Sequence, residues 1–157
     1  MRTRAKICGI TRPQDIQSVV NSGADAIGLV FFEPSPRYVN LEQATQLAKL
    51  IPPYVNIVGL FVNATAQEIK QVLEHVPLDI LQFHGDESPE QCQQIANYNK
   101  RRWYKAIQVK PDATSAEIIA TIQQYQDAGA SAMLLDAWHP ELKGGTGHSF
   151  DWSQFPK

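Results

Sequence analysis

Ile57-Val-Gly-Leu-Phe-Val62 is a run of six residues without a polar side chain. A strand that is apolar on both faces is typical of a parallel sheet covered by helices on both sides, or of a closed barrel. Ala132-Met-Leu-Leu135 has the same character. The sequence therefore predicts buried parallel strands.

Segments with helical periodicity separate these apolar runs. Thr11 is the expected N-cap of the first helix and Gly23 its end. Ser88 and Thr114 mark the expected starts of two later helices, and Gly129 marks the end of the second of these. The predicted strands are Ala5–Ile10, Ala26–Phe32, Asn56–Val62, Ile80–Phe83, Trp103–Val109 and Ala132–Ala137.

The alternation of strands and helices predicts a parallel α/β fold. Six strands begin between Arg4 and Ala132, at about 26 residues per βα unit, so an eight-unit barrel would need roughly 205 residues. We expect residues 1–157 to form a single domain with six such units, and the chain looks truncated.

Composition excludes several classes of protein. Hydrophobic residues make up 43% and charged residues 19% of the 157, as in a globular domain. The net charge of −2 predicts neither nucleic-acid binding nor attraction to an anionic membrane. There is no apolar run of about 20 residues and no signal-peptide pattern, so we expect a cytoplasmic protein without a membrane span.

The two cysteines and four histidines lack the spacing of a metal site. Cys8 and Cys92 form no CxxC motif, and the histidines form no HExxH motif. We therefore expect no metal. Cys92 shares a helical face with Ile95 and Ala96, which indicates a core position. A redox role for Cys8 is disfavoured because no second cysteine lies near it in the sequence.

Several polar residues follow the ends of predicted strands, where parallel α/β folds place their chemistry. Cys8 ends the first strand and precedes Gly9; it is a candidate nucleophile or base, or else a small buried hydrophobe. Arg37 lies in the loop Glu33-Pro-Ser-Pro-Arg-Tyr38, whose prolines would suit a clamp for a carboxylate or phosphate. An ordinary surface arginine is the alternative.

Later strands end in further candidates. Gln82 and His84 could point into a cleft, or the following turn could have only a capping role. Asp136 ends an apolar strand, where an unpaired carboxylate would be costly; it is a candidate general acid or a partner of a backbone N–H. The loop Gly144-Gly-Thr-Gly147 could approach a phosphate or a substrate ring closely.

Six ordered motifs together resemble one family along essentially the whole chain. The sequence is similar to phosphoribosylanthranilate isomerases, (β/α)₈ TIM barrels of tryptophan biosynthesis that use no cofactor. The motifs are Lys6-Ile-Cys-Gly-Ile-Thr11, Ala26-Ile-Gly-Leu-Val-Phe-Phe-Glu-Pro-Ser-Pro-Arg-Tyr-Val39, Gly59-Leu-Phe-Val62, Leu81-Gln-Phe-His-Gly85, Leu134-Leu-Asp136 and Gly144-Gly-Thr-Gly-His-Ser-Phe-Asp-Trp152.

The resemblance implies an Amadori rearrangement of N-(5-phosphoribosyl)anthranilate. Cys8 matches the family's general base, Asp136 its general acid and Arg37 the residue that binds the anthranilate carboxylate. Lys6 could favour the Cys8 thiolate, because it faces the same side of the strand. We further expect a small-molecule substrate, a monomer or homodimer, and substrate contacts from Gln82, His84, Gly144, Gly145, Thr146 and Gly147.

Two other interpretations stay open at this point. A barrel of this type usually binds phosphate with the loops after its seventh and eighth strands, which the sequence does not contain. We therefore expect weak activity from the isolated chain, or a non-catalytic fragment that needs strands from another chain. A nucleotide-binding open sheet is disfavoured, because neither GxGxxG nor a P-loop is present.

Overall fold

The computed structural model describes residues 2–137, which form one parallel sheet of six strands in the order β1-β2-β3-β4-β5-β6. Neighbouring strands in the sequence are neighbours in the sheet, which is the usual result of short βα connections. The strands are β1 (Lys6–Cys8), β2 (Ala26–Val30), β3 (Asn56–Phe61), β4 (Ile80–Phe83), β5 (Arg102–Val109) and β6 (Ala132–Ala137).

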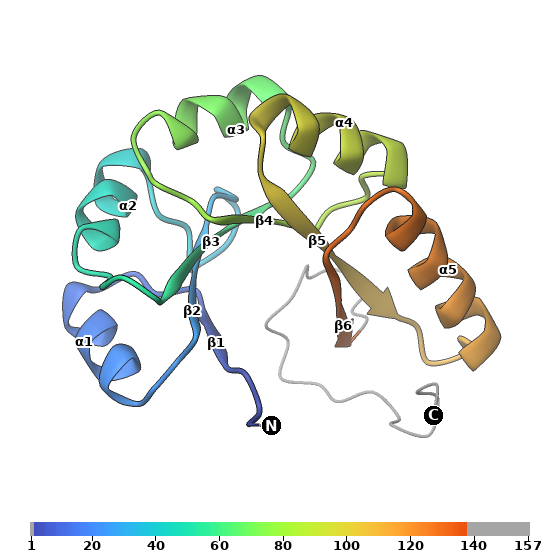
Figure 1. Ribbon diagram of the computed structural model, residues 1–157, viewed down its shortest axis with the longest axis horizontal. Coiled ribbons are helices and arrows are strands. Elements are labelled where there is room, and N and C mark those ends of the chain that lie inside the picture. Colours follow the sequence, from blue (N-terminus) through green and yellow to red (C-terminus); the bar gives the residue numbers. More distant parts are fainter. Residues whose placement is uncertain (1, 138–157) are drawn as a thin grey trace.

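Five helices cover the outer side of this sheet. The strands curve into an arc with the helices along its convex side, so the described residues form a large part of a barrel (Figure 1). The predicted parallel α/β fold is thus confirmed. The helices are α1 (Pro13–Asn21), α2 (Leu41–Ala48), α3 (Ala66–Leu73), α4 (Pro89–Asn99) and α5 (Ser115–Asp127).

The main core lies between the strands and these helices. Ile27, Leu29 and Leu81 are fully buried, and the helices contribute residues such as Ile16 and Ile69. Val58 and Leu60, on the other face of β3, are buried as well. This burial on both faces explains why the central strands lack alternating polar residues.

Most predicted helix ends are confirmed. Ser88 and Thr114 are N-caps that accept hydrogen bonds in capping boxes, and Gly23 and Gly129 follow the last helical turns with φ of +79° and +98°. Cys92 lies in α4 with 0% exposure, which confirms its core position.

The predicted N-cap at Thr11 is wrong. The N-cap of α1 is Arg12, whose backbone is extended and which makes no side-chain cap. Pro13 occupies the first helical position, and the residue before a proline avoids the helical conformation. The Arg12 side chain instead pairs with Asp15 in the first turn, at 2.8 Å.

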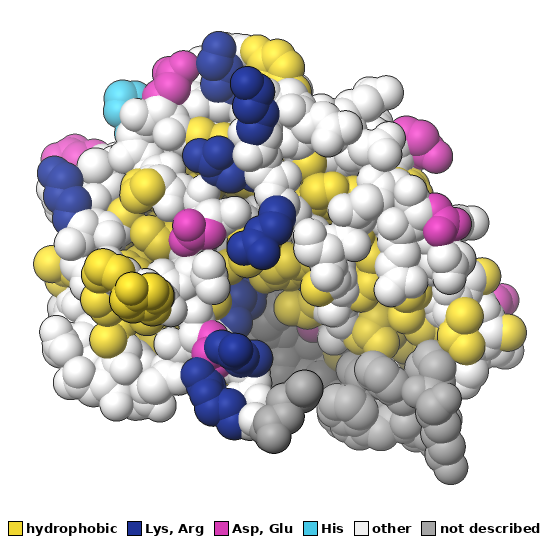
Figure 2. Space-filling model, in the orientation of Figure 1, with side chains coloured by type: hydrophobic (Ala, Val, Ile, Leu, Met, Phe, Trp, Pro, Cys, Tyr) yellow, Lys and Arg dark blue, Asp and Glu magenta, His cyan; other side chains and the backbone are white. Residues whose placement is uncertain are grey.

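Charges on the surface are mixed. Figure 2 shows Lys and Arg side chains in a narrow band across one face, with Asp and Glu side chains beside it and hydrophobic side chains on either side. Of the helices within residues 2–137, none has the length and apolar character that a membrane span requires.

Candidate functional site

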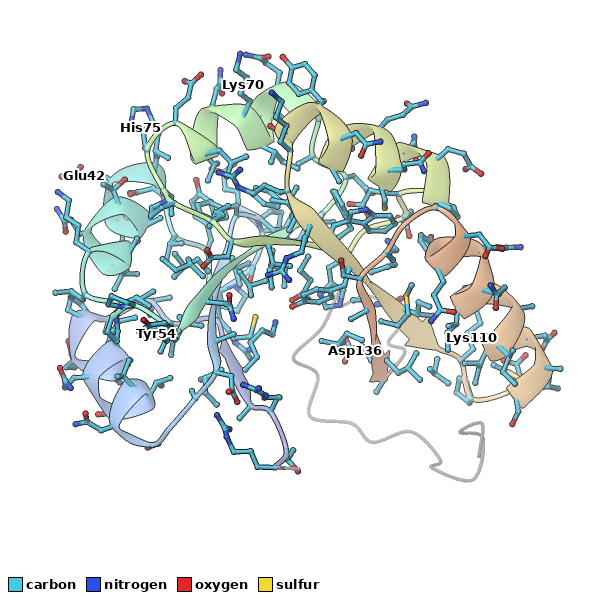
Figure 3. The ribbon with its side chains drawn as sticks, viewed as in Figure 1. Glu42, Tyr54, Lys70, His75, Lys110 and Asp136 are labelled. Carbon is cyan, nitrogen blue, oxygen red and sulfur yellow. The ribbon has the colours of Figure 1, made fainter. Side chains whose placement is uncertain are left out.

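The candidate residues gather at the carboxyl end of the sheet, because parallel strands all end there. Cys8 is the last residue of β1, His84 directly follows β4, and Asp136 is the second-last residue of β6. Asp136 lies on the concave side of the sheet, whereas Glu42, Lys70 and His75 lie around the outer rim (Figure 3). The candidate site is therefore on the inside of the arc.

Cys8 is half-buried and is held by the turn that follows it. Gly9 adopts φ +82°, and its N–H donates to the carbonyl of Gly28 in β2 at 2.8 Å. Cys8 and Gly28 are directly paired between β1 and β2. This turn ends β1 at Cys8, two residues earlier than predicted, and leaves the thiol at the strand terminus.

Arg37 comes close to the same turn. A Cβ built on Gly9 would lie 2.3 Å from Cδ of Arg37, so the stem of this arginine lies across Gly9. The loop that carries Arg37 is tied to the sheet, since Tyr38 bridges to Val30 in β2. Arg37 as a whole is exposed.

Gln82 and His84 link the middle of the sheet to Asp136. Gln82 Nε2 lies 3.2 Å from His84 Nδ1, and His84 Nε2 lies 3.1 Å from Asp136 Oδ2. Gln82 is only 1% exposed and His84 only 6%. The second carboxyl oxygen of Asp136 accepts the N–H of Ala137 at 3.1 Å. The Asp136 carboxylate is thus hydrogen-bonded, and both a histidine and a backbone N–H serve as its partners.

Lys6 and Tyr104 complete this cluster from β1 and β5. Both donate to Gln82 Oε1, Lys6 Nζ at 2.5 Å and the Tyr104 hydroxyl at 2.8 Å. Burial raises the pKa of the Tyr104 phenol, and negative charge on nearby Cys8 acts in the same direction. Lys6, Gln82, His84, Tyr104 and Asp136 therefore form one interior network that joins four strands.

A buried ion pair supports the loop after His84. Lys105 Nζ lies 2.7 Å from Glu87 Oε2 and donates to the carbonyl of Gly85 at 2.6 Å. Glu87 also accepts the backbone N–H groups of Asn63 and Gly85, at 2.6 and 2.9 Å. These contacts fix the loops after β3 and β4 relative to β5.

Several of these supporting residues were not anticipated from the sequence. Tyr104 and Gly28 read as ordinary strand residues, and Glu87 as part of a polar turn. No signal in the sequence points to Tyr104, because its pairing with Gln82 across β4 and β5 becomes visible only in the folded sheet. Gly144, Gly145, Thr146 and Gly147 lie outside the described residues.

Gln108 is a further polar residue beside Asp136, with which it is paired between β5 and β6. Its Nε2 is the one buried side-chain N or O atom within residues 2–137 that has no hydrogen-bond partner.

Residues 2–137 contain no group of three or more His, Cys, Asp or Glu side chains that could hold a metal ion.

Comparison with known proteins identifies the family. The family model for N-(5'-phosphoribosyl)anthranilate (PRA) isomerase matches residues 5–157. The chain belongs to the PRA isomerase family. The resemblance noted in the sequence is thereby confirmed.

Relatives in this family match the chain over nearly all of its length. The N-(5'-phosphoribosyl)anthranilate isomerase of Acinetobacter calcoaceticus is 69% identical over 157 residues, which are all of this chain and 72% of the relative. The crystal structure of phosphoribosyl anthranilate isomerase from Thermotoga maritima is 37% identical with a TM-score of 0.82, over 98% of this chain and 70% of that one.

A further solved PRA isomerase holds a ligand. It is 36% identical with a TM-score of 0.76, over 87% of this chain and 66% of that one, and is in complex with reduced 1-(o-carboxyphenylamino)-1-deoxyribulose 5-phosphate. That ligand carries a carboxylate on its phenyl ring and a phosphate on its sugar-derived chain. The similarity to these two solved structures shows that the chain has the fold of PRA isomerases, of which residues 2–137 contain six strands.

Proposed function

We propose that this chain is an isomerase that converts N-(5'-phosphoribosyl)anthranilate to 1-(2-carboxyphenylamino)-1-deoxyribulose 5-phosphate, a step of tryptophan biosynthesis. The observation that supports it most is the position of Cys8 and Asp136 at the carboxyl ends of β1 and β6, in a chain of the PRA isomerase family. A thiol and a carboxyl supply the base and the acid that an aldose–ketose isomerisation needs.

Asp136 acts as the general acid. Its protonated carboxyl gives a proton to the furanose ring oxygen of the substrate, and the C1′–O bond breaks. The nitrogen lone pair forms the C1′=N bond of a protonated Schiff base. The carboxylate that is left keeps the hydrogen bonds from His84 and from the N–H of Ala137. These donors stabilise the charge that the acid acquires.

Cys8 acts as the general base. Its thiolate removes the proton from C2′, and the electron pair of that bond moves to form C1′=C2′ while the C1′=N bond becomes single. The enolamine then tautomerises to the ketone by protonation at C1′ and loss of the O2′ proton. Substrate and product are isomers, so the sequence needs no oxidant and no cofactor.

Arg37 binds the carboxylate of the anthranilate ring. Arg37 is exposed, and the stem of its side chain crosses Gly9 directly after the proposed base. A planar guanidinium can hold a carboxylate with two parallel hydrogen bonds, which fixes the orientation of the ring. Gly144, Gly145, Thr146 and Gly147 are proposed to contact the substrate as well, since glycines permit a close approach to a phosphate or ring.

The test is the turnover of N-(5'-phosphoribosyl)anthranilate, generated in situ, by two proteins. One is the 157-residue chain, and the other is an extended chain, in which the C-terminal remainder of the Acinetobacter calcoaceticus relative follows residue 157. Turnover that is lost in Cys8→Ala and in Asp136→Asn supports the isomerase. No turnover by either protein would contradict it and favour a non-catalytic barrel fragment, the alternative from another class.

The remaining proposals concern partners and location. We propose a small-molecule substrate, no nucleic-acid or membrane partner, a monomer or homodimer, and a cytoplasmic location. The net charge of −2 and the mixed surface charges support the absence of a nucleic-acid partner. Sedimentation of the purified chain distinguishes monomer from dimer, and cell fractionation tests the location.

A further inference from the structure

The interior network assigns the proton of a buried histidine. His84 is 6% exposed, and each of its ring nitrogens has one partner, Gln82 Nε2 for Nδ1 and Asp136 Oδ2 for Nε2. A neutral imidazole has one N–H donor and one acceptor nitrogen. Which nitrogen carries the proton depends on which end of the Gln82 amide faces His84.

Lys6 settles the orientation of that amide. An ammonium group has three donors and no acceptor, so it can face only the oxygen of Gln82. Lys6 Nζ lies 2.5 Å from Gln82 Oε1, and the Tyr104 hydroxyl donates to the same oxygen at 2.8 Å. With Gln82 1% exposed, water does not replace these partners if the amide turns over. Oε1 therefore faces Lys6, and the NH₂ group faces His84.

The orientation of Gln82 then determines the state of His84. Because the amide NH₂ can only donate, Nδ1 of His84 must be the acceptor, and Nε2 must carry the hydrogen. An imidazolium would have N–H groups on both sides and would direct one of them against the NH₂ of Gln82. The contact between His84 and Asp136 is thus a hydrogen bond from a neutral imidazole to a carboxyl oxygen.

We propose that Lys6 and Gln82 are positioning residues that hold His84 as its Nε2–H tautomer, so that His84 donates to Oδ2 of Asp136 and does not take up the proton of the acid. This inference deepens the proposed function, on which it rests for the role of Asp136 as the acid. The tautomer itself is a property of the chain that can be measured without any turnover.

A donor aimed at Oδ2 has two consequences for the acid. While the carboxyl is protonated, His84 presents an N–H and no acceptor nitrogen to it, so His84 does not compete with the substrate for the proton. After the proton has left, the same hydrogen bond stabilises the carboxylate. If the tautomer were reversed, an unprotonated Nε2 would face Oδ2 and would draw the carboxyl proton toward His84, away from the substrate.

The decisive experiment is NMR of the ¹⁵N-labelled 157-residue chain, in which ring nitrogen shifts separate protonated from unprotonated positions. Four histidines are present, and His84→Gln assigns the resonances of His84. We expect Nδ1 of His84 to be unprotonated and Nε2 to be protonated. A protonated Nδ1 in the unaltered chain would overturn the proposal.

Gln82→Glu tests the cause. A carboxylate accepts from Lys6 and Tyr104 as the amide oxygen does, but it also accepts on the side of His84, so we expect Nδ1 to become protonated. The exposed His75 is the internal control and should keep its shifts. If His84 keeps the same tautomer in a folded Gln82→Glu chain, Gln82 does not determine it and the proposal is wrong.

Lys6→Met is a second variant in case Gln82→Glu does not fold. It leaves only the Tyr104 hydroxyl at Oε1, and a hydroxyl can donate or accept, so both amide orientations become accessible. We expect the two ring nitrogens of His84 to move toward averaged shifts. Shifts identical to those of the unaltered chain would contradict a role for Lys6.

A kinetic measurement separates this proposal from the proposed function. In the extended chain, Gln82→Glu should lower kcat about ten- to hundredfold, the size of a lost hydrogen bond to a charged group, with little change in KM, if Nε2 loses its proton as Nδ1 gains one. A ring that is protonated at both nitrogens keeps its donor to Asp136 and should keep its kcat. If His84 has the expected tautomer but neither the 157-residue chain nor the extended chain turns over the substrate, the proposed isomerase is refuted and the assignment of the tautomer stands. A normal kcat in Gln82→Glu with the tautomer reversed would refute the positioning role alone.

Discussion

The thiol of Cys8 occupies the space that a side chain at Gly28 would need. The two residues are paired between β1 and β2, and a Cβ built on Gly28 would lie 2.7 Å from Sγ and 3.2 Å from Cα of Cys8. A Cβ contact shorter than 3.0 Å, such as that with Sγ, essentially never occurs between real atoms, so a side chain at position 28 would force the thiol or the strand to shift. The absence of a side chain at Gly28 therefore sets where the proposed base stands.

Gly28→Ala should displace the thiol. We expect kcat/KM of the extended chain to fall about tenfold or more, because small misplacements of reacting groups are costly, and stability to fall by about 1–3 kcal/mol. Gly59→Ala is the matched control, since its Cβ would meet Leu78 Cδ1 at 2.5 Å in the core. That variant should lose stability and keep its activity per folded molecule. Equal activity in the two variants would show that Gly28 has no special part.

Alkylation should distinguish the two cysteines. Cys92 is 0% exposed, and burial, the main cause, raises the pKa of its thiol to about 12. At pH 8 only about one in ten thousand of such thiols is ionised. Iodoacetamide followed by mass spectrometry should therefore modify Cys8 alone in the native chain, and both cysteines after denaturation. Native Cys8→Ser should stay unmodified; rapid labelling of Cys92 there would contradict the buried position.

The strands could be predicted from the sequence because the helices and the sheet bury both of their faces, which leaves long apolar runs such as Ile57–Val62. The proposed base and acid were recognisable because each ends a strand. Tyr104 was not, since its contact with Gln82 depends on β4 and β5 being neighbours in register. Single sequences do not reveal such pairing.

The same limit applies to charged residues inside the fold. Lys105 reads as a solvent-facing position of a strand, yet its side chain is 5% exposed and pairs with Glu87, whose side chain is 4% exposed. The pair is separated by 18 residues. Local periodicity cannot distinguish a buried lysine with a distant partner from an exposed one, because the partner becomes visible only when the loop after β4 folds back onto β5.

Breaking this buried pair should destabilise the chain strongly. Lys105→Met leaves Glu87 as a buried carboxylate with its N–H donors but without its cation, and we expect a loss of about 3–5 kcal/mol. The double variant Lys105→Met/Glu87→Gln should recover part of that loss. Urea unfolding followed by tryptophan fluorescence measures both. Single and double variants of equal stability would mean that the unpaired charge is not the cause.

Asp25 should make the stability of the fold depend on acidic pH. Its carboxylate accepts from Arg2 at 2.6 Å and Arg4 at 2.8 Å, and from the N–H of Ala5 at 2.9 Å. The hydrogen bond from Arg2, and then those from Ala5 and Arg4, hold the pKa of Asp25 well below its usual range. These contacts tie the segment before β1 to the start of β2.

A carboxyl whose pKa is lower in the folded than in the unfolded state stabilises the fold when it is ionised. The contribution of Asp25 is therefore complete above the ordinary aspartate pKa of about 4, declines below it, and is gone once the pH is below the lowered folded pKa. Asp25→Asn should be less stable than the unaltered chain at pH 7, and the difference should shrink as the pH falls below about 4. The control is Asp112→Asn, which removes the same charge in the loop that follows β5. The difference in stability between Asp112→Asn and the unaltered chain should not shrink in this way as the pH falls. Denaturant unfolding between pH 7 and pH 2 measures both variants, and a gap between Asp25→Asn and the unaltered chain that stays constant over this range would show that the Asp25 carboxylate is not its source.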